Sequence, residues 1–257
     1  MKTAPFAVAA GVVLGWCTTG CGSHTAAPGI ACIPGGTVAV AFLDLDRLRS
    51  SPVYRHLPPM AVAPTESYRS AQHLLIAWNN TDVLIVAEGS FREAPPGATL
   101  ATRNLALSGA PGAVRAALAQ YRSGSTGVPG LLAYASKTAG RSPIWVAVQG
   151  GVTLPFTGNA GNLNRLFHNL DYAILSADLA APVKLDVTAF GRSQQAARDF
   201  EENLRAFLSL ASAAEGRHQE IAALLDSIQV HRQGAIATAS LSVPPEEIEK
   251  LVEPFTH

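Results

Sequence analysis

The chain has 257 residues, of which 48% are hydrophobic and 15% are charged, and this suits one large domain or two small ones with a buried core. Nineteen Lys and Arg residues balance 19 Asp and Glu residues, and no basic stretch interleaved with aromatic residues stands out. These features exclude a largely disordered chain and argue against a nucleic-acid-binding protein.

The first twenty residues have the pattern of a signal peptide. Lys2 supplies a positive charge, and residues 6–16 form an apolar run that is much shorter than the ~20 residues of a membrane span. Small residues then lead directly to a cysteine, in the order Thr18-Thr19-Gly20-Cys21. This tetrapeptide resembles the lipobox of bacterial lipoproteins, with Thr18 at the position where that family prefers Leu. We therefore expect residues 1–20 to be removed on export.

The resemblance implies that Cys21 is diacylated, becomes the mature N-terminus and anchors the protein in a membrane of the bacterial cell envelope, on the extracytoplasmic side. Residues 21–36 are mostly small, polar, Pro or Gly, so we expect a flexible tether. A plain secretory signal and an uncleaved membrane anchor are the alternative interpretations. If Cys21 were not acylated, it could form a disulfide with Cys32 in an oxidising compartment. Otherwise Cys32 is expected to be a buried, inert thiol.

Residues 37–123 are predicted to form a first α+β lobe. Alternating and apolar runs indicate strands, and the Asn residues at 79 and 80 favour a tight turn between two of them. The predicted elements are a strand at 38–43, a short helix capped by Asp44, a hairpin of strands at 73–78 and 83–87, short strands within 100–108 and a helix from Pro111. A linker of Gly, Ser, Thr and Pro at 123–130 marks the lobe boundary.

Residues 131–253 are predicted to form a second α+β lobe. Its best pattern is an amphipathic helix that follows Ser193, with apolar residues at helical spacing and charged residues between them. The predicted elements are a helix at 131–137, a strand at 144–149, a hairpin within 172–190, two helices within 193–228, a hairpin within 228–243 and a final helix from Pro244.

The two lobes share an order of elements, which indicates an internal duplication with the helices of residues 193–228 inserted only in the second copy. Asn162–Leu166 echoes Asp44–Leu48, and Leu241–Ile248 aligns without a gap with Leu107–Val114. The predicted fold class is α+β: two related lobes, antiparallel sheets with helices on one face, and a ferredoxin-like second lobe with an extension. The two sheets could pack on each other or join edge to edge.

Few side chains suggest chemistry. Asp44 and Asp46 lie beside a basic segment that could hold an anion, formed by Arg47, Arg49, Arg55 and His56. Because the echo has Asn162 and Asn164 in place of the two Asp residues, we expect helix capping and a solvated basic face.

A second candidate region is the Gly-rich loop 150–161 with the nearby His168, which precedes Asp171 by three residues. The loop lacks the glycine spacing of a phosphate-binding loop, and the chain has no G-x-S-x-G, H-E-x-x-H or C-x-x-C motif. No catalytic, metal or cofactor-binding residue is therefore predicted.

The sequence favours a non-catalytic lipoprotein that has a binding or structural role, with Cys21 as its lipidation site and an envelope protein or component as its partner. The alternative is an enzyme, such as a hydrolase, or a small-ligand receptor whose site lies in the groove between the lobes, beside loop 150–161 and His168. A purely structural spacer is a third hypothesis.

Overall fold

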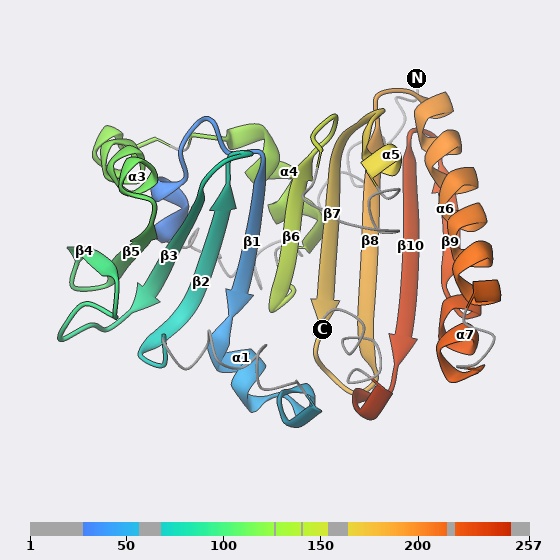
Figure 1. Ribbon diagram of the computed structural model, residues 1–257, viewed down its shortest axis with the longest axis horizontal. Coiled ribbons are helices and arrows are strands. Elements are labelled where there is room, and N and C mark those ends of the chain that lie inside the picture. Colours follow the sequence, from blue (N-terminus) through green and yellow to red (C-terminus); the bar gives the residue numbers. More distant parts are fainter. Residues whose placement is uncertain are drawn as a thin grey trace, which may run out of the picture.

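A computed structural model describes residues 28–56, 68–125, 127–139, 141–153, 164–214 and 219–247. Ten strands form one antiparallel sheet in the order β4-β5-β3-β2-β1-β6-β7-β8-β10-β9 (Figure 1). The strands are β1 (Ala39–Asp44), β2 (Ala71–Trp78), β3 (Val83–Gly89), β4 (Ala98–Thr102), β5 (Leu105–Gly109), β6 (Ile144–Gln149), β7 (Leu170–Asp178), β8 (Val183–Gly191), β9 (Gln229–Gln233) and β10 (Ile236–Val243).

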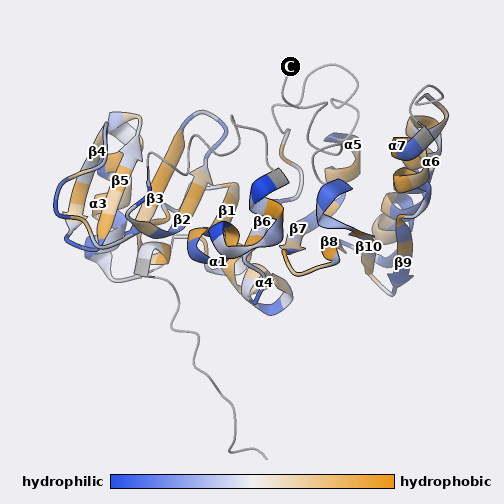
Figure 2. Ribbon diagram, turned by 90° about the horizontal axis from the view of Figure 1, so that it is seen from below, coloured by the Kyte–Doolittle hydropathy of each residue, from blue (hydrophilic) through white to orange (hydrophobic). Residues whose placement is uncertain are grey.

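Helices cover both faces of this sheet. Figure 2 shows α4 on one face and α5, α6 and α7 on the other. The helices are α1 (Leu45–Ser50), α3 (Pro111–Ser123), α4 (Pro129–Ala139), α5 (Asn164–Phe167), α6 (Gln194–Ala214) and α7 (Gln219–Asp226), and the 3-10 helices are η1 (Pro28–Cys32), η2 (Pro52–His56) and η4 (Pro245–Glu247). The prediction of helices on one face only is wrong, because apolar residues alternate onto both faces of the central strands.

The sheet has two halves that meet where β1 pairs with β6, with Ala41 opposite Val146. Outward from β1 the order is β2, β3, β5 and β4, and outward from β6 it is β7, β8, β10 and β9. The residues that the sequence assigned to two lobes therefore form the halves of one continuous sheet, joined edge to edge.

The predicted ferredoxin-like arrangement of the second half is wrong. In that arrangement, the first strand of the motif lies between the third and the fourth, whereas β6 pairs with β7 and β7 pairs with β8 as a meander. The short β7–β8 turn brings consecutive strands together at a low entropic cost. The helices α6 and α7 then connect β8 to the edge strand β9, so β9 and β10 add on the far side of β8 and not beside β6.

Both halves carry a β-bulge between their second and third strands, counted outward from the β1–β6 pair. The pairing shifts between Ala71 and His73 where β2 meets β3, and between Leu170 and Tyr172 where β7 meets β8. A glycine lies opposite each bulge: Gly89 pairs with Ala71, and Gly191 pairs with Leu170. A Cβ atom on Gly89 would lie 2.3 Å from the carbonyl oxygen of Ser70, so this close approach requires glycine.

The same register corrects the predicted residue match between the last strands of the two halves. Ser108 lies opposite Ile85, and Ala239 lies opposite Val187, at corresponding places in the two halves. Aligning the bulge glycines Gly89 and Gly191 places residues 107–114 against 238–245, three residues away from the predicted match with 241–248. Short apolar and small-residue stretches match at several offsets, and only strand pairing selects one.

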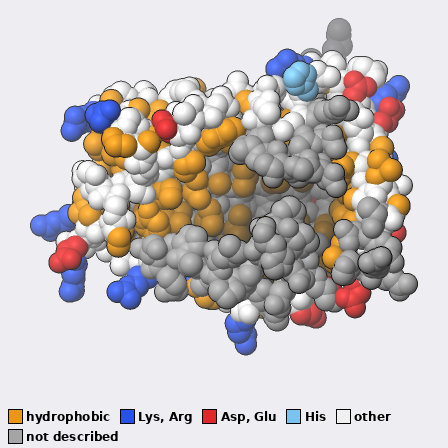
Figure 3. Space-filling model, viewed as in Figure 1, with side chains coloured by type: hydrophobic (Ala, Val, Ile, Leu, Met, Phe, Trp, Pro, Cys, Tyr) orange, Lys and Arg blue, Asp and Glu red, His pale blue; other side chains and the backbone are white. Residues whose placement is uncertain are grey.

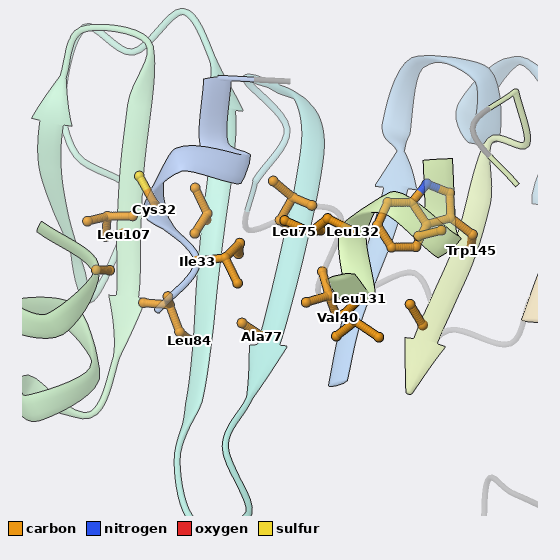
Figure 4. Packing of buried hydrophobic residues seen from close by; sticks show 14 of the residues in the cluster. Cys32, Ile33, Val40, Leu75, Ala77, Leu84, Leu107, Leu131, Leu132 and Trp145 are labelled. Atoms are coloured by element: carbon orange, nitrogen blue, oxygen red, sulfur yellow. The ribbon is translucent and has the colours of Figure 1, made fainter. Parts of the chain in front are cut away.

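On the first face of the sheet, a buried cluster joins η1, α3 and α4 to both halves (Figure 4). Cys32 and Ile33 are fully buried in it, together with Val40 and Leu75. The predicted tether through residue 36 is therefore too long, because the apolar side chains after Pro28 pack on the sheet. Residues 28–36 are therefore part of the fold.

The second face holds two further buried clusters. One lies beneath α1 and η2 and includes Leu45, Leu48 and Leu74. The other lies beneath the first part of α6 and includes Leu170, Ala173 and Phe200. Between the second cluster and the middle of the sheet, the described side chains leave the face unfilled, and this region forms the candidate site.

A candidate apolar cavity

A cavity of about 450 Å³ lies between α5, α6 and the second face of the second half of the sheet. Its lining is almost entirely aliphatic or aromatic. The sheet contributes Ile144, Val146, Leu175, Ala177, Leu185, Val187, Ala239 and Leu241, and the helices contribute Leu166, Phe167, Phe200, Leu204 and Leu208. Figure 3 shows this face of the molecule, with hydrophobic side chains gathered on it and a hollow beside them. A volume of this size falls in the range of small-molecule sites.

Strand alternation makes the floor of the cavity apolar. Leu175, Val187 and Ala239 are direct cross-strand neighbours and share the cavity face. The next residues along the same strands, Ser176, Asp186 and Ser240, are also opposite one another and border the cavity. Strand alternation turns their side chains to the other face, where Asp186 is exposed. Charge is thus directed away from the cavity. Leu175 remains 37% exposed although β7 is an interior strand, so the floor is incompletely covered.

Helix α6 begins in close contact with the sheet and then stands away from it. The hydroxyl of Ser193 accepts the N–H of Ala196 at 3.1 Å and so caps the helix, and Ala197 and Phe200 are buried. Beyond Phe200 no described side chain of α6 or α7 is buried. Leu204 and Leu208 border the cavity, whereas Leu210 is 73% exposed. The helix therefore forms one wall of the cavity, and its apolar side chains do not fill the space between the helix and the sheet.

An ionic cluster fixes α6 to the outer strands. Glu201 lies 3.1 Å from Arg205 and 3.1 Å from Arg232 of β9, and Arg205 also donates to the carbonyl of Val230. The hydrogen bond from Arg205, followed by that from Arg232, lowers the pKa of Glu201. These charges are not among the residues that line the cavity. They hold the helix in place, and the cavity-lining Leu204 and Leu208 lie on the adjacent apolar side of the helix.

The residues predicted near loop 150–161 do not converge on a site. His168 is exposed just after α5, and Asp171 pairs at 3.7 Å with Arg192. The N–H groups of Gly150 and Gly151 donate to the carbonyls of Asp171 and Phe167, so neither is available to a phosphate. The remainder of the predicted loop, residues 154–161, lies outside the described residues.

The acidic and basic candidates near α1 have structural contacts. Asp44 accepts the N–H of Arg47 at 2.9 Å, which confirms the capping prediction. The guanidinium of Arg47 donates to the carbonyl of Arg141, and that of Arg49 donates to the carbonyls of Ala71 and Tyr68. Arg55 is exposed, and the side chain of His56 lies outside the described residues. These arginines tie the end of β1 to its neighbours.

The most buried charged group lies on the first face, away from the cavity. Glu88 is 6% exposed and accepts hydrogen bonds from the N–H of Gly29 and from Nδ1 of His73, the second at 3.1 Å. The hydrogen bond with Glu88 raises the pKa of His73. Burial and the nearby Glu88 raise the pKa of Cys32 to about 11, so this free thiol is inert, as predicted.

Two further observations concern the described residues only. They contain no group of three or more His, Cys, Asp or Glu side chains placed to hold a metal ion. Within the same residues, none of the helices combines the length and the apolar character needed to cross a bilayer.

Comparisons with known proteins give a likeness of fold. No family model matches the sequence, and no curated protein matches it. Solved structures of a protein named TP0453 are similar. Crystal form III has a TM-score of 0.53 at 7% identity, with 88% of this chain and 97% of that chain covered, and crystal form I has a TM-score of 0.50 at 7% identity, covering 88% and 96%. At this identity the likeness concerns the mixed helix and antiparallel-sheet fold alone.

Sequence reasoning missed the cavity because its lining residues have the pattern of an ordinary core. The alternation in β8 and the helical spacing in α6 both predict burial, and neither reports how far apart the two elements stand. A signal was present in the last part of α6, where residues 206–214 contain no charged side chain. Such a stretch needs an apolar partner, and the described chain does not fully provide one.

Proposed function

We propose that this chain is a bacterial envelope lipoprotein, anchored through Cys21 on the extracytoplasmic side of a membrane, whose folded part binds the alkyl portion of an apolar or amphiphilic ligand. The cavity beneath α6 supports the binding role. The apolar run at residues 6–16 and the lipobox-like residues 18–21 support the anchor. The proposal keeps the ligand-receptor hypothesis. It places the ligand between α6 and the sheet, and not in a groove between two lobes.

The chemistry of the lining favours alkyl chains over peptides or polar metabolites. Each of the floor strands β7, β8 and β10 has a paired strand on both sides, so its backbone N–H and C=O groups are already used. A peptide entering the cavity would lose hydrogen bonds to water without replacing them. An alkyl chain loses none, and burying it against Leu175 and Leu185 removes apolar surface from water at about 25 cal/mol per Å².

We also infer that the two halves arose by duplication and that the insertion created the site. The equal strand orders and the matching bulges, each opposite a glycine, support a common origin. In the first half β3 and β4 are joined by residues 90–97, whereas in the second half β8 and β9 are joined by residues 192–228, which include α6 and α7. The added helices supply the wall of the cavity.

Binding can be tested by titrating a fluorescent long-chain fatty acid into the full-length protein with Cys21→Ser, purified without detergent. Leu204→Glu places a carboxylate against the cavity and should weaken binding more than tenfold, because a buried charge without a partner is strongly unfavourable. Leu210→Glu is the matched control on the same helix, at a position that is 73% exposed, and should leave the affinity unchanged. Equal affinities for all three proteins would reject the cavity as the binding site.

The anchor has a separate test. Growth of a bacterial expression host with a radiolabelled fatty acid should label the wild-type protein and not Cys21→Ser. Protease resistance of both proteins would show that the fold is intact. An unlabelled wild-type protein would reject lipidation while leaving the cavity hypothesis intact.

A further inference from the structure

A second and smaller pocket lies on the first face of the sheet, at one end of the first half. It has a volume of about 230 Å³, which suits a molecule smaller than a drug-sized ligand. Its floor is formed by Ala77 of β2 and Leu84 of β3, which pair directly and belong to the buried cluster on that face (Figure 4). Its walls are residues 34–37 before β1, the turn at residues 79–82 and the first two turns of α3.

Helix α3 begins at this pocket with two unpaired N–H groups. Its N-cap residue Ala110 provides no side-chain acceptor, Pro111 has no N–H group, and the N–H of Val114 donates to the carbonyl of Ala110. This leaves the N–H groups of Gly112 and Ala113, and neither has a hydrogen-bond partner among the described residues. Both residues line the pocket, and Ala113 is 8% exposed. Because the first turn of α3 contains no acidic residue, this end of the helix is free to hold an anion.

The side chain of Thr37 is a buried polar group that faces the same pocket. Thr37 is 3% exposed, and its N–H donates to the carbonyl of Pro34 at 3.1 Å. Its hydroxyl makes no hydrogen bond within the described chain. The described residues leave no fully buried polar side-chain atom without a partner, so this hydroxyl is not sealed in the core and opens into the pocket that Thr37 lines. A hydroxyl removed from bulk water without a partner is unfavourable, and a polar ligand group would provide that partner.

A carboxylate lies on another wall of the pocket. The side chain of Asp82 makes no hydrogen bond or ion pair with any described residue, and it does not cap α3. The neighbouring Asn79 accepts the N–H groups of Thr81 and Asp82 with its side-chain oxygen, at 3.1 and 2.7 Å, which fixes the turn that carries this carboxylate. A simple anion would be repelled by Asp82, and a simple cation by the N-terminus of α3. The pocket thus has one place for each sign of charge.

We propose that this pocket binds a small zwitterion, namely a free amino acid with a small side chain. The carboxylate of the ligand accepts the two unpaired N–H groups of α3 and the hydroxyl of Thr37, and its ammonium group pairs with Asp82. Ala77, Leu84 and Ala116 line the remaining space and provide apolar contacts for a small side chain. This inference goes beyond the proposed function, because the pocket and the apolar cavity share no described lining residue and lie on different faces of the sheet.

The test titrates L-alanine into the nitrogen-15-labelled full-length protein with Cys21→Ser, and it uses acetate and methylamine as fragments that carry only one of the two charges. Amide NMR spectra should show saturable shifts at Gly112 and Ala113, and the affinities follow from the same titrations. We expect alanine to bind about tenfold more tightly than either fragment, because only alanine uses both charged walls. A titration that does not saturate by ~10 mM alanine, or equal affinities for alanine and acetate, would overturn the proposal.

Substitution of Thr37 tests the unpaired hydroxyl. Thr37→Val has nearly the same shape and removes only that hydroxyl, so alanine binding should weaken about fivefold while stability in urea stays the same or rises. Thr81→Val is the matched control, because Thr81 is exposed and does not line the pocket, and it should leave the affinity unchanged. An unchanged affinity in Thr37→Val would overturn the proposal.

Substitution of Asp82 tests the charge pattern independently. Asp82→Asn should weaken alanine binding and strengthen acetate binding, since it removes the charge that attracts the ammonium group and repels a simple anion. Acetate affinity that stays the same in this variant would show that Asp82 does not act on the ligand, and the proposal would fail.

Discussion

The two halves of the sheet have the same strand order and differ in what covers their strands. In the first half, η1 and α3 pack closely on one face, and Leu75, Val86 and Leu107 are fully buried beneath them. In the second half, α6 leaves a cavity over β7, β8 and β10, with Leu185 and Val187 only partly buried. One architecture thus supports a packed core in one half and an apolar cavity in the other.

Under the proposed duplication, the difference is due to the helices inserted between β8 and β9. The strands of the second half keep their apolar face whether or not a helix fills the space above it. A long helix that is fixed at Phe200 and by the Glu201 cluster can stand away from that face further along, because these anchoring contacts all lie in the first half of the helix. Four experiments, in decreasing order of expected effect, sharpen or break this comparison.

The largest effect is expected from removing core volume in the first half. Leu75 is fully buried, so Leu75→Ala should lower the free energy of unfolding by about 2 to 5 kcal/mol. Leu185→Ala makes the same change at a cavity-lining position and should cost about 1 kcal/mol or less, since the site already borders empty space. Urea denaturation measures both. Equal losses would mean that the two halves are equally packed.

The bulge glycines test whether the two halves are equivalent. A Cβ atom would lie 2.3 Å from the Ser70 oxygen at Gly89 and 2.8 Å from the Ala197 nitrogen at Gly191. Gly89→Ala and Gly191→Ala should each destabilise the fold by about 1 to 3 kcal/mol in thermal or urea unfolding. Gly112→Ala is the control, because a Cβ atom there meets nothing within 4 Å. A neutral result at either bulge would argue against their equivalence.

The cap of α1 should have a smaller effect. Asp44→Ala removes the acceptor for the Arg47 N–H and should cost about 1 kcal/mol in the free energy of unfolding. Asp46→Ala, which loses only an exposed contact of 3.7 Å with Arg49, should cost less than about 0.5 kcal/mol. Similar losses for both substitutions would indicate that charge, and not capping, is what stabilises this turn.

The smallest expected effect is a pH dependence on the first face. Because its hydrogen bond with Glu88 raises the pKa of His73, the proton on His73 stabilises the fold. That contribution is complete below the unfolded pKa of about 6.5 and is lost as the pH rises through the raised folded pKa. The stability difference between wild type and His73→Gln should therefore be larger at pH 5.5 than at pH 8.5, by less than about 1 kcal/mol, since solvent screens the partly exposed ring. A difference that is the same at both pH values would contradict this.

Local patterns predicted most of the elements. The period-2 alternation and the Asn79–Asp82 turn located the β2–β3 hairpin, in which the side chain of Asn79 accepts the N–H groups of Thr81 and Asp82. Helical spacing after Ser193 located α6. These predictions succeeded because the determinants lie within a few residues of one another.

Long-range features were predicted less well. Three predictions depended on strand pairing, which adjacent residues do not specify. They are the ferredoxin-like topology, the placement of all helices on one face of the sheet, and the match of residues 107–114 with 241–248. The tether was placed too far along because the burial of Cys32 and Ile33 depends on distant partners such as Leu75. The cavity depends on the distance between α6 and β8, and no local sequence pattern predicts that distance.

The central claim is that alkyl chains bind in the second half and not in the first. It is tested most directly by methyl NMR of the soluble Cys21→Ser protein, labelled at Leu and Val methyl groups, during titration with palmitic acid. The account predicts saturable shifts for Leu175, Leu185, Val187 and Leu204, with Leu75, Leu84 and Leu107 unchanged. Shifts confined to methyl groups of the first half, or none at saturating palmitic acid, would contradict it.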